Sequence, residues 1–514
     1  MIIEHDQITS DLSEAADVVV IGSGVGGMTV AQRLAQSGAK VVVLERGGYY
    51  SAARGDLDQR SDNMLARIDG RRGLGTSTTG EIALMYGNCV GGASVHYWAD
   101  SWRLPKDRAD LYVRMGVEGH EHEVLEPIFA QIETELNVHL AGPDYYNRMN
   151  QLFDIGAKKL GWPVEGVPQA RRGCAKSGHC YQGCSFDAKQ SALVTSVPAA
   201  IKAGAKLYSD CEVVGITRDD TGKADGAQAI FIDRATGRPN GRKLRVKAKI
   251  VVLAAGGFAS AAIWMRSKLP NGSGQVGRNL YVNPCPYLYA MYDEPVVLWE
   301  NIPTATGTTE FRLPRYDGKS YIEGGYLLHP NQIQAEFLAA TIPGFGESHA
   351  RIMERLTHIG SAVSWIDDEM PGQIAIDGNG KATYDYTVRG IDLLKTRDAL
   401  KKQAMLLFAS GAREIIVPDI AGTRLRDPKQ IPIFDNLDMT GGNTLWGGPH
   451  PAGALRMGKD PISSVIGSDH QAHEVPGLYV ADPSAFPRPP SVDPSLTIMA
   501  WSVIAANAVQ ARLG

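Results

Sequence analysis

The sequence predicts a mixed α/β fold with two domains, and three observations support that prediction. A strand–helix–strand unit begins at Asp17, a long apolar strand ends at Leu253, and a section rich in short strands occupies residues 281–439. Buried strands that alternate with helices are typical of a parallel sheet, whereas successive strands are typical of an antiparallel one. We therefore expect one domain with a parallel sheet and a second domain with an antiparallel sheet.

The first unit has the features of a turn that binds a dinucleotide. An apolar strand over residues 18–21 runs into a G-x-G-x-x-G motif formed by Gly22, Gly24 and Gly27. Gly22 permits a tight turn, Gly24 lets a pyrophosphate approach the backbone, and Gly27 lets the helix pack closely on the strand. The free N–H groups of the following helix would face the phosphates.

A second apolar strand over residues 40–44 completes this unit and ends in Glu45. An acidic residue at this distance from the glycine motif is suited to a ribose hydroxyl. The sequence therefore predicts a Rossmann-like dinucleotide site, with Arg46 next to Glu45 at its edge.

Composition and charge exclude several function classes. The 514 residues are 44% hydrophobic and 21% charged, with a net charge of −4, so they carry no electrostatic signature of a nucleic-acid partner. No apolar run reaches the length of a transmembrane helix, and residues 1–16 have no apolar segment of a secretory signal. We expect a cytoplasmic location, although export together with a partner subunit stays open.

The middle of the chain alternates helices and strands. Apolar residues at helical spacing predict helices within residues 107–141 and 145–160, and a third over 188–203. Strands are expected over residues 206–216 and 246–253. The polar segment between residues 48 and 80 has no clear period and is expected to be a long excursion over the cofactor or at a subunit contact.

The section over residues 281–439 differs in composition. It has more strand-like runs, at residues 287–291, 321–327 and 361–365, and a helical stretch at 391–408. This pattern predicts an antiparallel sheet covered by helices.

Two further stretches carry chemistry. Gly91 and Gly92 permit close approach of the backbone to a flat ligand, and they lie in a run that also contains Val90, Ser94 and His96. Near the carboxyl end, the sequence H-P-A-G begins at His450, a second run contains Asp482, and a third contains Asp493, Pro494 and Thr497.

These motifs, in this order, resemble those of the glucose-methanol-choline (GMC) family of flavin oxidoreductases. The run from Val90 to His96 is similar to the family's V-G-G-x-[ST]-x-H-W, and the runs from His450 and around Asp482 are similar to its carboxyl-terminal signatures. The resemblance implies FAD as cofactor. It also implies a discontinuous FAD-binding domain over residues 1–110, 165–280 and 440–514, with a substrate-binding domain over residues 111–164 and 281–439.

The resemblance also implies roles for individual residues. It places Val213 and Ala255 on FAD, in addition to Asp482, Pro494 and Thr497 and the glycine-rich stretches described above. A histidine at the position of His96 is bonded covalently to the flavin in some relatives and only packed beside it in others, and both alternatives stay open here. A helix that starts near Ser495 would direct its N-terminus at the ring. His470 and His473, by contrast, are expected to be solvated.

Flavin-dependent oxidation of an alcohol requires removal of the hydroxyl proton while hydride leaves for the flavin. A neutral imidazole is suited to take that proton, and the family motif gives His450 this role. The sequence departs from the family at Asp493, where His or Asn is usual. We hypothesise that an ionised Asp493 accepts a hydrogen bond and raises the pKa of His450; the alternative is that Asp493 is protonated or turned away.

Three cysteines, Cys174, Cys180 and Cys184, lie within eleven residues. Their spacing resembles that in catalytic subunits of bacterial sugar dehydrogenases of this family, in which such a triplet holds an iron–sulfur cluster. The absence of a proline after Cys184 argues against this, and zinc would need the crowded His179 as a fourth ligand. A metal cluster and plain structural cysteines both stay open.

The sequence therefore predicts an FAD-dependent dehydrogenase that oxidises an alcohol, such as a sugar, amino sugar or polyol, and passes electrons to an acceptor other than NAD, for example an electron-accepting protein. An oxidase that produces hydrogen peroxide is the alternative within this class. A flavin-binding subunit without turnover is the alternative from another class.

Overall fold

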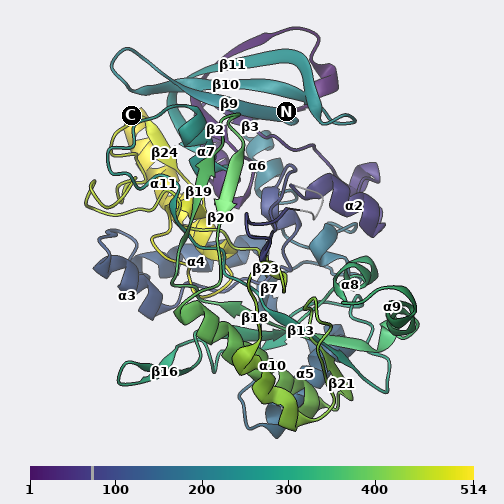
Figure 1. The fold of residues 1–514 in the computed structure, drawn as a ribbon. Coiled ribbons are helices and arrows are strands. Elements are labelled where there is room, and N and C mark those ends of the chain that lie inside the picture. Colours follow the sequence, from purple (N-terminus) through teal and green to yellow (C-terminus); the bar gives the residue numbers. More distant parts are fainter. Residues whose placement is uncertain (71–74) are drawn as a thin grey trace.

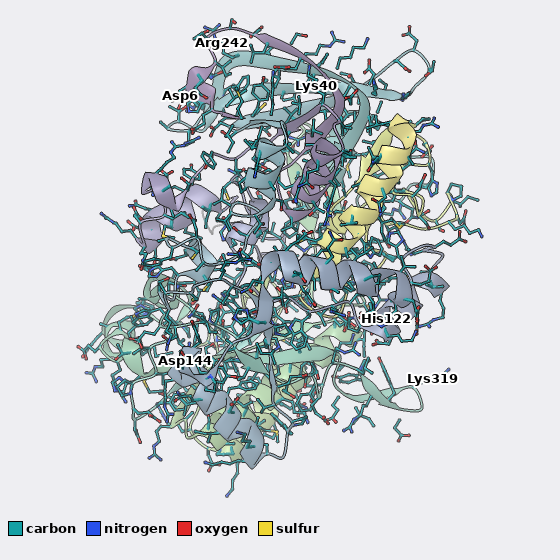
Figure 2. The ribbon with its side chains drawn as sticks, turned by 180° about the vertical axis from the view of Figure 1, so that it is seen from behind. Asp6, Lys40, His122, Asp144, Arg242 and Lys319 are labelled. Atoms are coloured by element: carbon teal, nitrogen blue, oxygen red, sulfur yellow. The ribbon has the colours of Figure 1, made fainter. Side chains whose placement is uncertain are left out.

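The computed structural model describes residues 1–70 and 75–514. The predicted mixed α/β fold is confirmed. Figure 1 shows a large sheet in the upper part of the molecule and a second sheet in the lower part, where helices cover it. Charged side chains such as Lys40, Asp144, Arg242 and Lys319 point outward into solvent (Figure 2).

The described part of the upper sheet has eight strands. Its parallel part contains β2 (Leu12–Ile21), β3 (Val41–Leu44), β8 (Lys206–Tyr208) and the short β1 (Ile2–Ile3). The long strand β11 (Arg238–Leu253) pairs in parallel with β2, and the end of β11 also pairs with β24 (Leu478–Val480). The first half of β11 instead forms an antiparallel meander with β10 (Ala224–Asp233) and β9 (Cys211–Arg218).

The helices of this part follow from the buried faces of their sequences. Helix α1 (Val25–Gln36) buries Met28, Val30 and Leu34, and it packs against α6 (Ser196–Lys202) and the carboxyl-terminal α11 (Ser495–Leu513). Within the described chain, α11 is the helix long and apolar enough to span a membrane, but most of it is buried as a core helix. Helix α7 (Ser260–Arg266) packs on β9.

The lower sheet has the strand order β17 (Tyr326–Pro330), β18 (Ile359–Ile366), β13 (Tyr287–Met291), β21 (Glu414–Ile416) and β22 (Arg424–Leu425), all antiparallel. Helix α10 (Ile391–Ser410) lies across it with α5 (Arg148–Lys159) beside it. The wall toward the upper sheet includes α8 (Ala335–Thr341) and α9 (Gly346–Met353), the smaller strands β19 (Gly372–Ile376) and β20 (Ala382–Asp385), and the β4–β23 pair (Ile82–Leu84 and Trp446–Gly448).

Several predicted elements differ from the observed ones. The strand expected over residues 206–216 is two strands, because Asp210 has a left-handed φ of 52° and turns the chain between β8 and β9. The strand expected over 321–327 is also two, since Gly324 and Gly325 have φ of 89° and 83°. The helix expected over 188–203 forms only as α6, and the one expected over 107–141 is two helices, α3 (Lys106–Arg114) and α4 (His122–Leu136).

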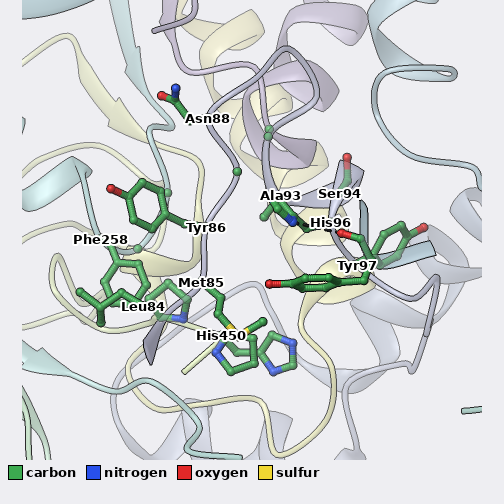
Figure 3. Close-up of a pocket in the computed structure, with 18 of the residues that line it drawn as sticks. Leu84, Met85, Tyr86, Asn88, Ala93, Ser94, His96, Tyr97, Phe258 and His450 are labelled. Carbon is green, nitrogen blue, oxygen red and sulfur yellow. Dashed lines mark hydrogen bonds between the residues drawn. The ribbon is translucent and has the colours of Figure 1, made fainter. Parts of the chain in front are cut away.

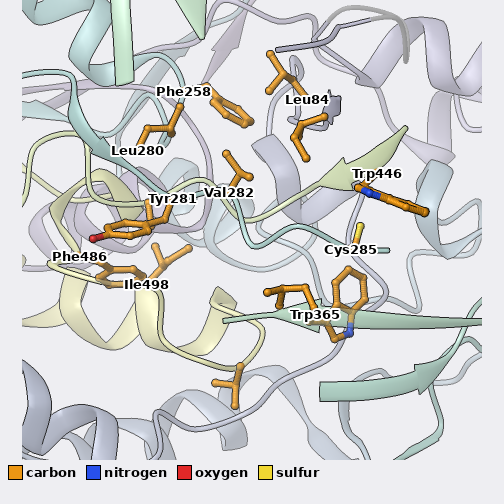
Figure 4. Close-up of a cluster of buried hydrophobic side chains, with 14 of the residues drawn as sticks. Leu84, Phe258, Leu280, Tyr281, Val282, Cys285, Trp365, Trp446, Phe486 and Ile498 are labelled. Atoms are coloured by element: carbon orange, nitrogen blue, oxygen red, sulfur yellow. The ribbon is translucent and has the colours of Figure 1, made fainter. Parts of the chain in front are cut away.

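The polar excursion after residue 48 contains a short helix, α2 (Ser61–Ile68). Residues 71–74 of the excursion lie outside the described residues. Beyond it, a cluster of aromatic and aliphatic side chains fills the space between the two sheets. Leu84, Phe258, Tyr281, Trp365 and Trp446 belong to this cluster (Figure 4). The two sheets are therefore joined by a continuous apolar core, and the division into domains at the predicted boundaries stays a prediction.

Candidate active site

A cavity of about 620 Å³ is lined by residues of both large sheets and their connections. This volume lies in the usual range for a cavity that holds a ligand. Many of the residues predicted from the sequence line it, including Gly22, Gly24, Glu45, Arg46, Gly92, Ser94, His96, Val213, Ala255, His450, Asp482, Asp493 and Pro494. Gly27, Val90, Gly91 and Thr497 do not line it, and they pack behind its wall.

At one end of the cavity two glycine stretches meet. Gly22 has a φ of 104°, and a Cβ there would lie 2.3 Å from the carbonyl oxygen of Ala254. Gly92 has a φ of 56°, and a Cβ there would lie 2.7 Å from Cα of Gly24. Gly24 itself faces open space, since a Cβ at this position would meet no described atom within 4 Å. The backbone at Gly24 is thus open to a ligand at the start of α1, which fits the diphosphate of a dinucleotide.

Glu45 lies beside this opening and is buried. Its Oε2 accepts from the backbone N–H and the hydroxyl of Ser23, at 2.9 and 2.7 Å, and its Oε1 accepts from the N–H of Gly47 at 2.8 Å. Burial raises the pKa of this carboxyl. Glu45 therefore fixes the turn after β2 from within, and its predicted contact with a ribose would use the remaining lone pairs of its oxygens.

The second glycine stretch is tied to the first. The N–H of Gly91 donates to the Ser23 hydroxyl at 3.1 Å, and the Ser94 hydroxyl donates to the carbonyl of Gly91 at 2.6 Å. Asp482 has a similar fixing role, because its oxygens accept from Gly256 N–H at 2.9 Å and from Ser484 N–H at 2.8 Å. Their predicted contacts with FAD stay predictions.

His96 lies on the cavity wall and is buried. Its Nδ1 is 3.1 Å from the carbonyl oxygen of Tyr181, and its Nε2 is 3.9 Å from Oδ2 of Asp69. Burial lowers the pKa of this imidazole. His96 is therefore a neutral ring held by its neighbours, and Figure 3 shows it above the cavity with His450 below.

His450 follows β23 at the other end of the cavity. Its Nδ1 is 2.8 Å from Oδ1 of Asn283, an oxygen that can only accept, so Nδ1 carries the proton and donates it. The amide nitrogen of Asn283 donates to the carbonyl of Ile366 at 2.5 Å, which keeps this amide from turning. The Nε2 lone pair of His450 is therefore bare on the neutral ring, and burial lowers the pKa of the ring to about 3.

Asp493 approaches this lone pair from the segment before α11. Its Oδ1 lies 3.6 Å from Nε2 of His450, and its Oδ2 is buried without a hydrogen-bond partner among the described residues. Burial, and repulsion from Asp100, raise the pKa of the Asp493 carboxyl well above its usual value. Burial disfavours the charged form of both groups, so these directions favour the alternative, a protonated Asp493 beside a neutral His450, over the hypothesis of an ionised Asp493 that raises the pKa of His450.

Asp100 is a site residue that sequence reasoning missed. Both of its oxygens accept from the hydroxyl of Thr304, at 2.7 and 2.8 Å, and Oδ1 also accepts from the amide of Gln169 at 3.0 Å. Burial raises its pKa to about 7. Asn283 and Trp365, whose ring centroid lies 5.5 Å from that of His450, were missed as well. None of the three lies in a motif; the only signal was the position of Asp100 four residues after His96.

The cysteine triplet does not form a metal site in this structure. Among residues 1–70 and 75–514, no group of three histidine, cysteine or carboxylate side chains is arranged to hold a metal ion. Instead, the guanidinium of Arg171 lies against two of the sulfurs, 3.3 Å from Sγ of Cys180 and 4.0 Å from Sγ of Cys174. A fixed cation therefore contacts two of the three sulfurs, and the iron–sulfur alternative is not supported.

The expectation that His470 and His473 are solvated is also wrong. His470 is buried, its Nε2 is 3.1 Å from Nε2 of His120, and both rings pack on Trp501. His473 is partly buried and bonds to Ser464. Polar sequence around a histidine does not reveal that a distant helix will cover it.

Comparison with known proteins agrees with this geometry. Family models described as GMC oxidoreductase match residues 16–285 and 370–502. An uncharacterised GMC-type oxidoreductase of Mycobacterium tuberculosis is 28% identical over 505 residues, which cover 97% of this chain and 76% of that protein. A long-chain-alcohol oxidase of Arabidopsis thaliana is 24% identical over 534 residues, which cover 96% of this chain and 67% of that protein.

Among solved structures, pyridoxine 4-oxidase from Mesorbium loti has the same fold. The TM-score is 0.70 at 17% identity, over 96% of this chain and 98% of that one.

The opening at Gly24 can be tested by Gly24→Val. The new side chain projects into the space open to the diphosphate, so we expect the purified variant to lose most of its flavin absorbance while its circular dichroism is unchanged. Gly215→Val is the matched control, because a Cβ at Gly215 also meets no described atom within 4 Å but lies in β9, outside the cavity lining. Full flavin content in Gly24→Val would show that the diphosphate lies elsewhere.

Proposed function

The chain belongs to the GMC oxidoreductases, a family of FAD-binding enzymes, and from this premise we propose that it oxidises an alcohol group with His450 as the general base. The observation that supports this role is the fixed tautomer of His450. Its Nδ1 proton is held by Asn283 at 2.8 Å, and the bare Nε2 faces the cavity. A general base needs such a lone pair within reach of the proton that it removes.

Each group around His450 has a separate role in the proposed oxidation. FAD, when bound, supplies the hydride acceptor. Nε2 of His450 takes the proton of the substrate hydroxyl, and burial keeps the ring neutral until then. A protonated Asp493 can donate a hydrogen bond from its unpartnered Oδ2 to the substrate oxygen. The N-terminus of α11 begins two residues later, at Ser495, and stabilises negative charge near the cavity.

We propose that the substrate is an alcohol with an apolar body. The cavity lining includes Tyr287, Phe337, Trp365 and Trp446, and the ring centroid of Trp365 lies 5.5 Å from that of His450. Their rings offer large apolar area and few hydrogen bonds. The relative from Arabidopsis thaliana is named a long-chain-alcohol oxidase, which supports the same substrate class.

The polar side chains on this wall support the proposal in a different way. Asn331 donates to the hydroxyl of Ser361 at 3.1 Å, Gln334 donates to the carbonyl of Gly178 at 2.6 Å, and Thr341 donates to the carbonyl of Phe337 at 2.7 Å. These three groups are engaged with the protein, and few polar atoms of the lining, such as Oε1 of Gln332 and Nε1 of Trp446, have no hydrogen-bond partner among the described residues. A sugar needs many hydrogen bonds to compensate for the loss of its water, so a sugar substrate is less favoured than the sequence alone suggested.

For the electron acceptor we propose dioxygen, which would give hydrogen peroxide. The name of the relative from Arabidopsis thaliana supports an oxidase. The cysteine triplet was the reason to expect transfer to a protein acceptor, and its sulfurs lie against Arg171 instead. The dehydrogenase remains the alternative. Both alternatives for His96 stay open, since Nδ1 lies 3.1 Å from the carbonyl oxygen of Tyr181 whereas Nε2 lies 3.9 Å from Asp69, beyond hydrogen-bond distance.

Turnover in air without an added acceptor tests the function. We expect 1-octanol and benzyl alcohol to reduce the flavin and to release peroxide, with glucose at least about tenfold lower in kcat/KM, as for a polar substrate in an apolar site. His450→Gln should keep its flavin and lose about 100-fold or more in kcat. Flavin reduction without peroxide would support the dehydrogenase instead, and no reduction by any alcohol would support the subunit without turnover.

Asn283→Asp should change the pH dependence of turnover. A carboxylate beside the Nδ1 proton stabilises the imidazolium, so it raises the pKa of His450. Because the base acts only when neutral, the fall of kcat/KM on the acid side should move to higher pH in the variant. In the native enzyme that fall should lie well below the ordinary histidine value of about 6.5. Equal profiles for the two enzymes would remove His450 from the role of base.

Two substitutions at Asp493 separate its protonation states. If the carboxyl is neutral and donates, Asp493→Asn keeps a donor and should retain kcat/KM within about threefold, whereas Asp493→Leu should lose about tenfold or more. Both variants should bind FAD. An equal, large loss in both would instead indicate that Asp493 acts as an anion.

A further inference from the structure

The three cysteines take no part in the proposed function, yet the loop that carries them brings two of their sulfurs against a buried cation. It follows β7 (Pro168–Ala170) and begins with Arg171. The nitrogen Nη1 of Arg171 lies 3.3 Å from Sγ of Cys180 and 4.0 Å from Sγ of Cys174. Cys174 is half-buried and Cys180 is buried. Two thiols thus share one cation, and one of them is open to solvent.

Arg171 is fixed in this place. Its side chain is buried; Nε donates to Oε1 of Gln169 at 2.7 Å, and Nη2 donates to the carbonyl of Trp98 at 2.6 Å. The N–H of Lys176 adds a second donor to Sγ of Cys174, at 3.4 Å. A guanidinium and an N–H group stabilise negative charge on the sulfur they face, and the anion is the nucleophilic form of a thiol.

The same loop forms part of the cavity wall. Tyr181 and Gln182 line the cavity, and the carbonyl of Tyr181 is the partner of His96 Nδ1 at 3.1 Å. The carbonyl of Gly178 accepts from Gln334, the residue before α8, whose Phe337 faces the substrate side. A change in the backbone between residues 174 and 181 would therefore reach both the flavin side and the substrate side of the cavity.

A second connection runs through Arg171 itself. Gln169, which holds Nε of Arg171, donates from its amide nitrogen to Oδ1 of Asp100 at 3.0 Å. Asp100 lines the cavity and its charge acts on Asp493. The cation that contacts the two sulfurs is thus linked through Gln169 to Asp100, whose charge acts on the residue beside the proposed base.

We propose that Cys174 and Cys180 are a redox-active thiol pair that hydrogen peroxide converts to a disulfide, and that this slows turnover. The thiolate of Cys174 attacks one peroxide oxygen, the O–O bond breaks, and sulfenic acid and hydroxide form. Cys180 then attacks the sulfur of Cys174, a second hydroxide leaves, and the S–S bond forms. Peroxide gains the two electrons that the thiols lose, and the two hydroxides take up the two thiol protons as water. The pair acts on added peroxide, so it does not depend on whether the enzyme itself is an oxidase.

The test is peptide mapping of the intact FAD-loaded protein after treatment with excess hydrogen peroxide and alkylation of the remaining thiols. Trypsin separates residues 173–176, which contain Cys174, from residues 177–189, which contain Cys180 and Cys184. We expect these two peptides to be linked, with loss of about two free thiols per chain, and the link to disappear with dithiothreitol. Cys184→Ser, the matched control in the same loop, should still form the linked peptide, and Cys174→Ser should not.

Turnover gives the second readout. The flavin reduction rate of the native protein and of Cys184→Ser should fall after peroxide and recover with dithiothreitol, whereas Cys174→Ser, with its flavin content unchanged, should be insensitive. Four results would overturn the proposal: no linked peptide, a link that is lost in Cys184→Ser, an oxidised protein with unchanged turnover, or purified protein that carries iron on these sulfurs.

Discussion

The hydrogen bond between His450 and Asn283 is the contact on which the chemistry of this cavity depends. A histidine buried without a partner has no preferred tautomer, and half of its orientations would turn a protonated nitrogen toward the substrate. Oδ1 of Asn283, 2.8 Å from Nδ1 of His450, fixes the proton on Nδ1. The side-chain amide of Asn283 cannot turn, because its nitrogen donates to the carbonyl of Ile366. Asn283 has a left-handed φ of 52°, and its N–H donates to the buried Asp368 at 3.2 Å. The orientation of the proposed base is thus set by the backbone next to the lower sheet.

This contact also explains why the cavity lies between the two sheets. His450 belongs to the chain that follows β23, whereas Asn283 precedes β13 of the lower sheet. The two segments are held side by side by a bridge between Tyr281 and Ala452. The end of the cavity predicted to hold the diphosphate, in contrast, is built on β2 and α1 of the upper sheet. An extended cofactor fits because one end of the cavity belongs to each sheet, and the apolar core between them fixes the distance.

The features that could be predicted are those determined by residues close together in the sequence. The glycines after β2 were predictable because the turn that needs a left-handed φ at Gly22 and open space at Gly24 is formed by a few consecutive residues. Strands β13 and β18 were predictable for the same reason, as short runs rich in apolar residues. The role of His450 needed its motif. Asn283 and Asp100 could not be predicted, because each acts through a partner far away in the sequence.

The errors have the same cause. His470 was expected in solvent because its neighbours are polar, but His120 and Trp501 cover it from distant elements. The cysteine spacing left a cluster and plain structural cysteines both open, because spacing says nothing about Arg171, whose side chain turns back onto the sulfurs. The sequence around a residue therefore predicts the secondary structure of that residue better than it predicts the tertiary contacts of its side chain.

The buried carboxyls of Asp493, beside His450, and of Asp100, whose charge acts on Asp493, show how one network decides which group carries charge. An ionised carboxylate in a buried site costs several kcal/mol unless donors surround it. Asp100 has such donors, from Thr304 and from Gln169, and Arg171 stands behind Gln169. Oδ2 of Asp493 has no such partner among the described residues. If one of the pair is ionised it is Asp100, and its charge then keeps the proton on Asp493. Arg171 in turn is shared between this network and the sulfurs of Cys174 and Cys180. A disulfide between these sulfurs could no longer carry negative charge next to Arg171. The positive charge of Arg171 would then act more strongly on Asp100. The oxidation state of the thiols is in this way linked to the proton on Asp493, beside the proposed base.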